Sequence, residues 1–178
     1  MSVSEDVNTA VEFKGRCASK KFPEDTNEDK QLILNMCLYA SDNASPTKQS
    51  IIYFKWLATE MEEYYQQGDL ERKLDFTISP FFDRTTCNPF KFQIGYIDVI
   101  VMPLFTIWCQ FKPAYTEDCI TKGLLENKKL LESKVEETKN LMQMRESPGR
   151  DSFNGATTTP NVELAKLGSN MKEFNGSK

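Results

Sequence analysis

The chain of 178 residues contains no histidine. Imidazole is the commonest metal ligand in proteins, and it is the side chain that most readily gains and loses a proton near neutral pH. A mechanism that needs a histidine as metal ligand or as proton donor therefore cannot be completed by this chain alone.

Cysteine is sparse and scattered. The five cysteines are odd in number and form no C-x-x-C pair (Cys17, Cys37, Cys87, Cys109 and Cys119). This pattern argues against both a disulfide framework and a zinc site. We expect reduced thiols in a cytoplasmic protein.

Positive charge is in the minority, and the net charge is -4. We therefore expect neither nucleic acid nor an anionic membrane as a partner. The first residues, MSVSEDVNTA, are acidic and polar where a signal peptide would carry positive charge and then an apolar run. The apolar run Ile97–Cys109 contains Asp98 and Pro103 and is shorter than the roughly 20 residues that a membrane span needs. We expect no membrane span and interpret this run as part of a buried helix.

Two helices are predicted in the first half of the chain. Thr26, with Asp29 three residues later, precedes apolar residues at helical spacing, which predicts a helix over residues 28–40. Ser45 before Pro46 predicts an N-cap followed by a first helical residue, and no breaker follows before Gly68. The apolar side of this second helix is predicted to consist of Ile52, Trp56, Met61, Tyr64 and Tyr65.

Two further helices are predicted in the second half. Asn88 before Pro89 repeats the cap signal and predicts an apolar helix over residues 90–111, kinked at Pro103. Thr116 is predicted to cap a last helix over residues 117–144. No stretch shows strand alternation, so the predicted fold class is all-α. From Ser147 the composition changes to Pro, Gly, Ser, Thr and Asn, which predicts one domain over residues 1–145 and a disordered tail over residues 146–178.

Four motifs follow one another in the chain. They are ASDNASPTK (40–48), EMEEYYQQGDLERKL (60–74), ISPFFDR (78–84) and FQIGYIDVIVMPLF (92–105). In order and spacing they resemble the C-terminal part of the catalytic domain of class I cyclic nucleotide phosphodiesterases. That family carries an ADxSNPTK-like segment, an EFFxQGDxE helix end, an SPxxDR loop and a QxGFIDxIxxPL helix. The resemblance implies the multi-helix fold of that catalytic domain, of which this chain carries the C-terminal portion.

The resemblance implies hydrolysis of the cyclic nucleotides cAMP or cGMP to 5'-monophosphates. Members of the family use a metal pair, usually zinc and magnesium, held by two histidines and two aspartates, and a histidine protonates the leaving oxygen. The second of these aspartates falls on Asp42. The family's upstream histidine motifs are absent from this chain, so we expect it to be inactive by itself. Without the resemblance, Asp42 is interpreted as an ordinary aspartate at a helix end.

The resemblance also implies a purine-binding site. In the family, the glutamine of the last motif hydrogen-bonds the base and the aromatic residue three positions later stacks on it; these positions are Gln93 and Tyr96. A spacing of three places both on one side of a helix. Phe81 falls where the family contributes an apolar wall to this pocket. The alternative is that Gln93 bonds nearby backbone while Tyr96 and Phe81 are core residues.

Three positions depart from the family pattern. Ser45 replaces an asparagine that lies beside the nucleotide pocket, and Asn43 replaces an apolar residue. Glu60 replaces an apolar residue that packs on the other face of the purine. A carboxylate at that position costs desolvation and disfavours a cyclic nucleotide, which is itself an anion.

These patterns leave two functions open. The chain is either a truncated cyclic nucleotide phosphodiesterase, completed by a longer chain or a companion subunit, or a non-catalytic chain that binds and regulates. In both cases another phosphodiesterase chain is a candidate partner that covers the apolar helices. A helical interaction protein with no nucleotide history would leave the four ordered motifs as coincidence.

Overall fold

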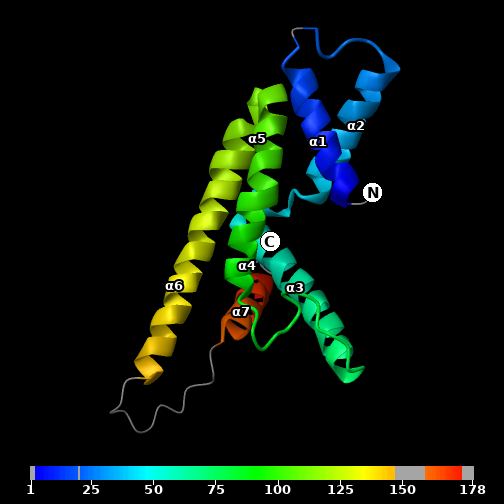
Figure 1. Cartoon of the computed structure of the whole chain (residues 1–178). Helices are drawn as coiled ribbons and strands as arrows, with labels where there is room; N and C mark the ends of the chain where they lie inside the picture. Colours follow the sequence, from blue (N-terminus) through cyan, green and yellow to red (C-terminus); the bar gives the residue numbers. More distant parts are fainter. Residues whose placement is uncertain (1–2, 20, 147–158, 174–178) are drawn as a thin grey trace. The chain divides into compact units, whose positions relative to one another are not determined.

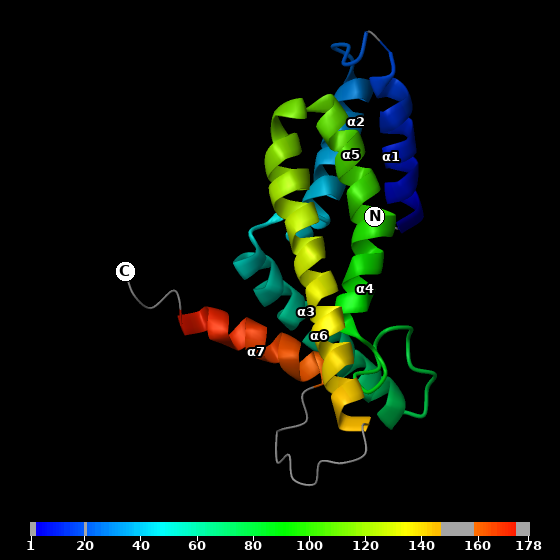
Figure 2. The ribbon, with the colours of Figure 1, turned by 90° about the vertical axis from the view of Figure 1, so that its left-hand side faces the viewer.

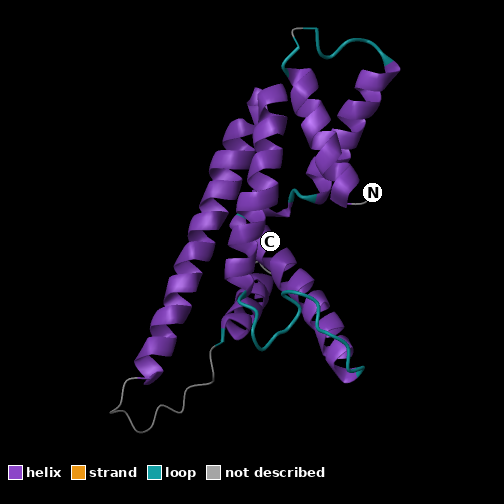
Figure 3. Ribbon diagram, in the orientation of Figure 1, coloured by secondary structure: helices purple, strands orange, loops and turns teal. Residues whose placement is uncertain are grey.

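The computed structural model describes residues 3–19, 21–146 and 159–173. These residues form helices joined by loops and turns, and none of them lies in a strand (Figure 3). The predicted all-α fold class is confirmed. All five cysteines are free thiols.

The chain divides into two compact units. Unit 1 comprises Met1–Lys48 and Ile97–Leu125, and unit 2 comprises Gln49–Tyr96 and Glu126–Lys178. Each unit therefore combines segments that are far apart in the sequence, as the colours of Figure 1 show.

Unit 1 is built around α1 (Val3–Cys17), α2 (Asn27–Asp42) and α5 (Met102–Phe111). These helices contact one another and lie side by side in Figure 2. The ring of Phe13 is fully buried and packs against Phe22, Trp108 and Phe111 at centroid distances of 5.2–6.1 Å. This aromatic cluster holds α1 against α5.

The first predicted helix is confirmed together with its cap. The hydroxyl of Thr26 accepts a hydrogen bond from the backbone N–H of Asp29 at 3.2 Å. The buried carboxylate of Asp29 accepts hydrogen bonds from Arg16 and from the N–H of Glu24. The start of α2 is therefore fixed both by its cap and by an ion pair with α1.

The prediction that Ser45 caps a long helix is wrong. Residues Ser45–Thr47 form a short 3-10 turn, η1, and Lys48 then adopts an extended conformation with ψ 164°. The long helix α3 spans Ser50–Lys73, beginning later and ending later than predicted. Gly68 does not end this helix. Its lack of a side chain has another role, because it allows the backbone of Phe82 to approach α3 closely.

Unit 2 is built from α3, α4 (Pro89–Tyr96), α6 (Glu126–Glu146) and α7 (Pro160–Glu173). The buried side of α3 carries residues at a spacing of four (Tyr53, Leu57, Met61 and Tyr65). Ile52 and Trp56, which were predicted on that side, are exposed. The helix α7 packs against α3, and Leu164 is buried (Figure 1).

The cap at Asn88 is confirmed, because its side-chain oxygen accepts the N–H groups of Phe90 and Lys91 at 3.1 Å each. After α4 the helix continues through a π-helical turn, η2 (Ile97–Val101), into α5. Pro103 lacks an N–H and its ring crowds the preceding turn, which is a reason for irregular helix at this point.

The apolar run from Pro89 to Phe111 also bears on the membrane prediction. Within the described residues it is the one helical segment long and apolar enough to cross a membrane by length and composition, and 33% of its apolar window is buried. The core helix of a soluble protein passes the same test.

The predicted last helix, residues 117–144, begins differently in the structure and is preceded by other helical segments. A 3-10 turn, η3 (Pro113–Tyr115), leads straight into a π-helical segment, η4 (Glu117–Leu125), and then into α6. Thr116 is already helical, with φ -60° and ψ -47°, so it does not cap. In the segment predicted as a disordered tail, residues 160–173 form α7; residues 147–158 and 174–178 lie outside the described residues.

Candidate functional site

Gln93 lies on α4 and is 2% exposed. Its amide oxygen accepts a hydrogen bond from the hydroxyl of Tyr53, on α3, at 3.0 Å. Tyr53 is itself 1% exposed. The buried amide is therefore bound by a side chain from another helix, and the phenol fixes its orientation.

Tyr96 lies one turn after Gln93 on α4 and is half-buried. Burial raises the pKa of Tyr53, and the nearby carboxylate of Glu60 and phenol of Tyr96 raise it further. Gln93 therefore binds Tyr53 directly, and Tyr96 lies near enough to act on the pKa of Tyr53. The hydroxyl of Tyr53 carries its proton at neutral pH, as any tyrosine does, and donates it to the amide oxygen of Gln93.

Glu60 also belongs to this group of residues. The hydroxyl of Tyr64 donates to the carboxylate of Glu60 at 2.8 Å. Burial raises the pKa of Tyr64, and the hydrogen bond and charge of Glu60 raise it further, followed by Tyr96. We call Tyr53, Glu60, Tyr64, Gln93 and Tyr96 the Gln93 cluster.

Phe81 lies on the loop between α3 and α4. It is exposed, and its backbone has a positive φ of 71°, which non-glycine residues rarely adopt. Its ring stacks on Phe92 of α4 at 4.9 Å, while the neighbouring Phe82 stacks on Tyr64 at 4.8 Å. The loop is thus joined by aromatic contacts to the helices that carry the Gln93 cluster.

Polar contacts hold the same loop to α3. The carboxylate of Glu71 accepts hydrogen bonds from the backbone and hydroxyl of Ser79 at 2.6 and 2.8 Å. Arg84 binds both Asp69 and Glu62. These acidic and basic residues of the EMEEYYQQGDLERKL and ISPFFDR motifs therefore have a structural role.

The other two predicted site residues lie in unit 1. Asp42 is the last residue of α2 and is exposed, and its carboxylate has no hydrogen bond or ion pair among the described residues. Ser45 begins the η1 turn, and its buried hydroxyl oxygen has no hydrogen-bond partner among the described residues.

The described residues do not fit a metal pair. They contain no group of three or more His, Cys, Asp or Glu side chains that could hold a metal ion. Asp42 is a single exposed carboxylate, and one carboxylate with no neighbouring ligand cannot hold a catalytic metal. No metal-dependent step is therefore assigned to this chain.

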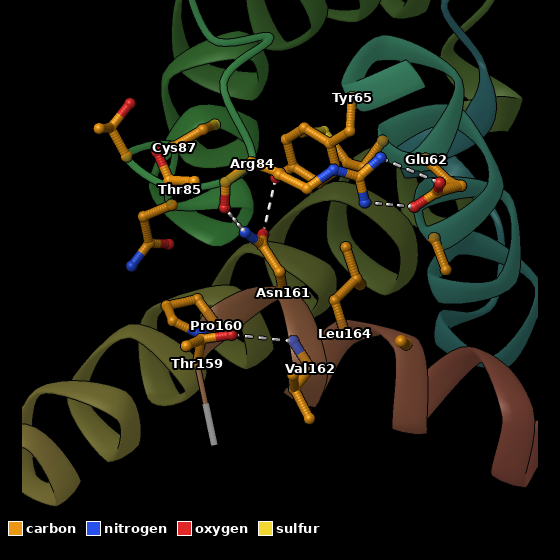
Figure 4. Close-up of a pocket in the computed structure, with 15 residues that line it drawn as sticks. Glu62, Tyr65, Arg84, Thr85, Cys87, Thr159, Pro160, Asn161, Val162 and Leu164 are labelled. Atoms are coloured by element: carbon orange, nitrogen blue, oxygen red, sulfur yellow. Dashed lines mark hydrogen bonds and ion pairs between the residues drawn. The ribbon is translucent and has the colours of Figure 1, made fainter. Parts of the chain in front are cut away.

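A cavity of about 710 Å³ lies elsewhere in unit 2, between α3, the loop before α4 and the start of α7 (Figure 4). Neither Gln93, Tyr96 nor Phe81 lines it. Asn161 of α7 connects two walls of the cavity. The hydroxyl of Tyr65 donates to the side-chain oxygen of Asn161 at 2.7 Å, and the side-chain nitrogen of Asn161 donates to the carbonyl of Arg84.

The cavity offers no activated nucleophile. Its one thiol, Cys87, has a pKa raised by burial, with a smaller opposing effect from Tyr65. The guanidinium of Arg84 is bound to Asp69 and Glu62 and lies 5.4 Å from the ring of Tyr65. Polar groups in the cavity wall, those of Arg84, Tyr65 and Asn161, are thus bound to other protein groups. We interpret these contacts as the means by which α7 is held against α3.

A solved structure shares this fold. LmjPDEB1, solved in complex with IBMX, aligns with a TM-score of 0.68 at 21% identity, covering 75% of this chain and 40% of that chain. The all-helical fold is thus shared with a solved phosphodiesterase.

Sequence matches identify the family. A family model for 3'5'-cyclic nucleotide phosphodiesterase matches residues 3–122, so the chain belongs to this family. The probable 3',5'-cyclic-AMP phosphodiesterase pde-4 of Caenorhabditis elegans is 34% identical over 77% of this chain. Isoform F of the Drosophila melanogaster 3',5'-cyclic-AMP phosphodiesterase is 33% identical over 85% of it. The chain spans 20% and 23% of these two relatives.

Two members of the Gln93 cluster were not predicted as site residues from the sequence. Tyr64 was assigned only to the apolar side of α3, and Tyr53 was not singled out. A tyrosine at the four-residue spacing of a buried helix side is a usable signal, because a buried phenol needs a hydrogen-bond partner. The distance of 40 residues between Tyr53 and Gln93 hides which partner it has.

Proposed function

We propose that this chain supplies the base-recognition part of a 3',5'-cyclic nucleotide phosphodiesterase. The observation that carries the proposal is the buried amide of Gln93, held by Tyr53 and followed one turn later on α4 by Tyr96. An oriented amide beside an aromatic ring suits a planar base, which needs edge hydrogen bonds and a stacking surface.

Each predicted residue has a role under this proposal. The amide of Gln93 binds the purine edge, Tyr96 stacks on the ring, and Phe81 provides an apolar wall. Ser45 would contact the nucleotide, and its unpartnered hydroxyl is compatible with a bond to a ligand. The names of the two relatives make cAMP the first substrate to test.

Hydrolysis itself requires residues that this chain does not contain. The metal pair, zinc and magnesium in the family, would be held by histidines and an aspartate from a longer protein or another chain, with Asp42 as the ligand contributed here. We expect the purified chain to hydrolyse neither cAMP nor cGMP above a metal-only blank.

A histidine-bearing phosphodiesterase segment is also the partner that we propose covers the exposed apolar side chains. In unit 1, Leu34 and Leu38 lie one turn apart on α2 and are 62% and 54% exposed. In unit 2, Ile52 and Trp56 lie one turn apart on α3 and are also exposed. Such pairs are typical of surfaces that another segment covers.

The experiment combines this chain with the histidine-bearing part of the catalytic domain of the Drosophila relative, with zinc and magnesium present. The expected result is cAMP hydrolysis in the mixture only, lost when Gln93→Leu replaces the wild-type chain. Gln66→Leu, at an exposed position of α3, is the control. Hydrolysis that is unchanged by Gln93→Leu would contradict the assigned role of Gln93.

A second candidate function is binding or regulation without catalysis. The observation that favours it is the carboxylate of Glu60 within the Gln93 cluster. Under this alternative the mixture stays inactive, while this chain still binds a purine or the phosphodiesterase segment, which calorimetry would detect.

A further inference from the structure

A long loop, residues 74–88, joins α3 to α4 and contains no helix or strand. Loops of this length without secondary structure are uncommon in compact domains and usually have a functional role. Phe82, in the middle of this loop, stacks on Tyr64 of the Gln93 cluster at 4.8 Å, with the two rings 7° from parallel. The conformation of the loop therefore decides which aromatic group borders the cluster.

Side chains of α3 hold the end of this loop only weakly. Arg84 forms ion pairs with Asp69 and Glu62 at 2.7 and 3.2 Å, but the three side chains are 35–50% exposed. Exposed ion pairs contribute little to stability, because water competes for both charges. A further contact is therefore needed to fix the main chain at Arg84.

The C-terminal helix α7 supplies that contact through Asn161. The side-chain nitrogen of Asn161 donates to the backbone carbonyl of Arg84, and its oxygen accepts from the hydroxyl of Tyr65 at 2.7 Å (Figure 4). Tyr65 is 4% exposed, and Leu164, one turn after Asn161, is 3% exposed. One side chain of α7 thus bonds to α3 and to the main chain of the loop beside buried groups.

Packing alone does not fix the loop at this point. The cavity of about 710 Å³ lies beside the two hydrogen bonds of Asn161, and Thr85, Thr86 and Cys87 of the loop line it. Side chains in a close-packed interior have little room to move, whereas this part of the loop borders open space. The bond from Asn161 to Arg84 therefore restricts a segment that packing leaves free to shift.

We infer that α7 holds the loop in place against the Gln93 cluster and that Asn161 is the residue through which it does so. Asn161 is a positioning residue, because it acts through the backbone of Arg84, two residues after Phe82. Its effect on a substrate rests on the proposed base-recognition function, since the loop borders the cluster through Phe82 and Tyr64. The C-terminal helix would then control the order of the base-recognition site.

Hydrogen exchange of the full chain, followed by mass spectrometry, tests this role. Asn161→Asp keeps an oxygen that accepts from Tyr65 and removes the N–H group that bonds Arg84. Loop amides such as that of Cys87, which is hydrogen-bonded within the loop, should exchange about fivefold faster than in wild-type protein. Amides of α7 should change less than about twofold, because the contact with Tyr65 remains.

Two further variants of α7 serve as controls. Glu163→Gln removes an ion pair with Lys134 of α6 and leaves both hydrogen bonds of Asn161 in place, so loop exchange should match that of wild-type protein. Leu164→Ala keeps Asn161 but weakens the packing of α7. In this variant α7 and the loop should exchange faster together.

A second readout addresses the base-recognition site. In the mixture with the histidine-bearing segment, zinc and magnesium, Asn161→Asp should raise the KM for cAMP about threefold and change kcat less than about twofold. A displaced loop weakens binding without altering the groups that carry out hydrolysis. A fall in kcat with unchanged KM would contradict the positioning role.

The outcomes distinguish this role from the proposed function. If Asn161→Asp leaves loop exchange unchanged, or if Leu164→Ala frees α7 while the loop stays protected, the role of Asn161 is overturned and base recognition stands. If the wild-type mixture does not hydrolyse cAMP, the proposed function fails, and the exchange rates alone decide whether α7 holds the loop.

Discussion

Gln93 in unit 2 and Asp42 in unit 1 are both predicted site residues, but their surroundings differ. Gln93 is 2% exposed and bonded to Tyr53, whereas Asp42 is exposed and has no described partner. Gln93, which we propose recognises a base, is therefore held in place by a side chain of this chain. Asp42, which we propose binds a metal, would need ligands that the described residues do not bring near it.

The two tryptophans allow the units to be followed separately. Trp56 lies on α3 in unit 2, and Trp108 lies in the aromatic cluster of unit 1. With Trp108→Phe as background, fluorescence reports on unit 2; with Trp56→Phe as background, it reports on unit 1. These two backgrounds separate the effects of substitutions in unit 1 from those in unit 2.

The largest effect is expected from Gly68→Ala in unit 2. An added Cβ would lie 2.1 Å from the carbonyl oxygen of Phe82, so the loop must move away from α3. We expect the free energy of unfolding of unit 2 to fall by about 3 kcal/mol, measured by urea denaturation with Trp56 fluorescence.

Gly95→Ala is the control, because no neighbouring atom lies within 4 Å of its added Cβ. It should stabilise by up to about 1 kcal/mol, since alanine favours helix more than glycine does. Equal losses in both variants would contradict the close contact at Gly68. Gly123→Ala, whose Cβ would lie 2.4 Å from the carbonyl of Thr47, should affect the Trp108 reporter instead.

A smaller loss is expected from Tyr53→Phe, which leaves the buried oxygen of Gln93 without its donor. We expect unit 2 to lose about 1–2 kcal/mol in urea denaturation. Tyr115→Phe removes an exposed hydroxyl and should have no measurable effect. If the two variants are equally stable, the hydrogen bond between Tyr53 and Gln93 does not form in solution.

Acid should weaken the loop next to the Gln93 cluster. Hydrogen bonds from the Thr85 hydroxyl and N–H and from Arg72 lower the pKa of Asp83 from 3.8 to about 2. Because this pKa is lower in the folded state, the stabilisation is complete above pH 3.8 and is lost as the pH falls through about 2. NMR titration of the Asp83 carboxyl group measures its pKa. Asp83→Asn should remove the loss of stability that comes from protonating Asp83. An Asp83 pKa near the ordinary value of 3.8 would contradict this prediction.

The smallest effect is expected from Asp42→Asn. The exposed carboxylate has no described partner, so unit 1 should change by less than about 0.5 kcal/mol, measured with Trp108 fluorescence. Zinc or magnesium should not alter the stability of the wild-type chain. A metal-dependent increase that Asp42→Asn abolishes would show that unit 1 does hold a metal.

Local signals predicted local structure correctly. Thr26 and Asn88 cap helices because their side chains reach backbone N–H groups two or three residues away, which depends only on nearby sequence. Ser45 carried the same signal and failed, because Lys48 is extended and interrupts the helix. Caps are therefore predictable only where the following residues stay helical.

Non-local contacts could not be predicted. The buried side of α3 differs from the predicted side at Ile52 and Trp56, since apolar residues occur on more than one side and packing decides which is covered. Tyr53 binds a residue 40 positions away, and no periodicity encodes that distance. The helix α7 was missed because its polar composition conceals the buried Leu164.

The position of Asn161 has a practical consequence for anyone who shortens this protein. A version ending at residue 146 would remove the acceptor of the Tyr65 hydroxyl and uncover Met61 and the lining of the 710 Å³ cavity. Such a version should aggregate more readily and be digested by proteases more easily than one that retains residues 159–173. Expression boundaries are therefore best placed after Glu173.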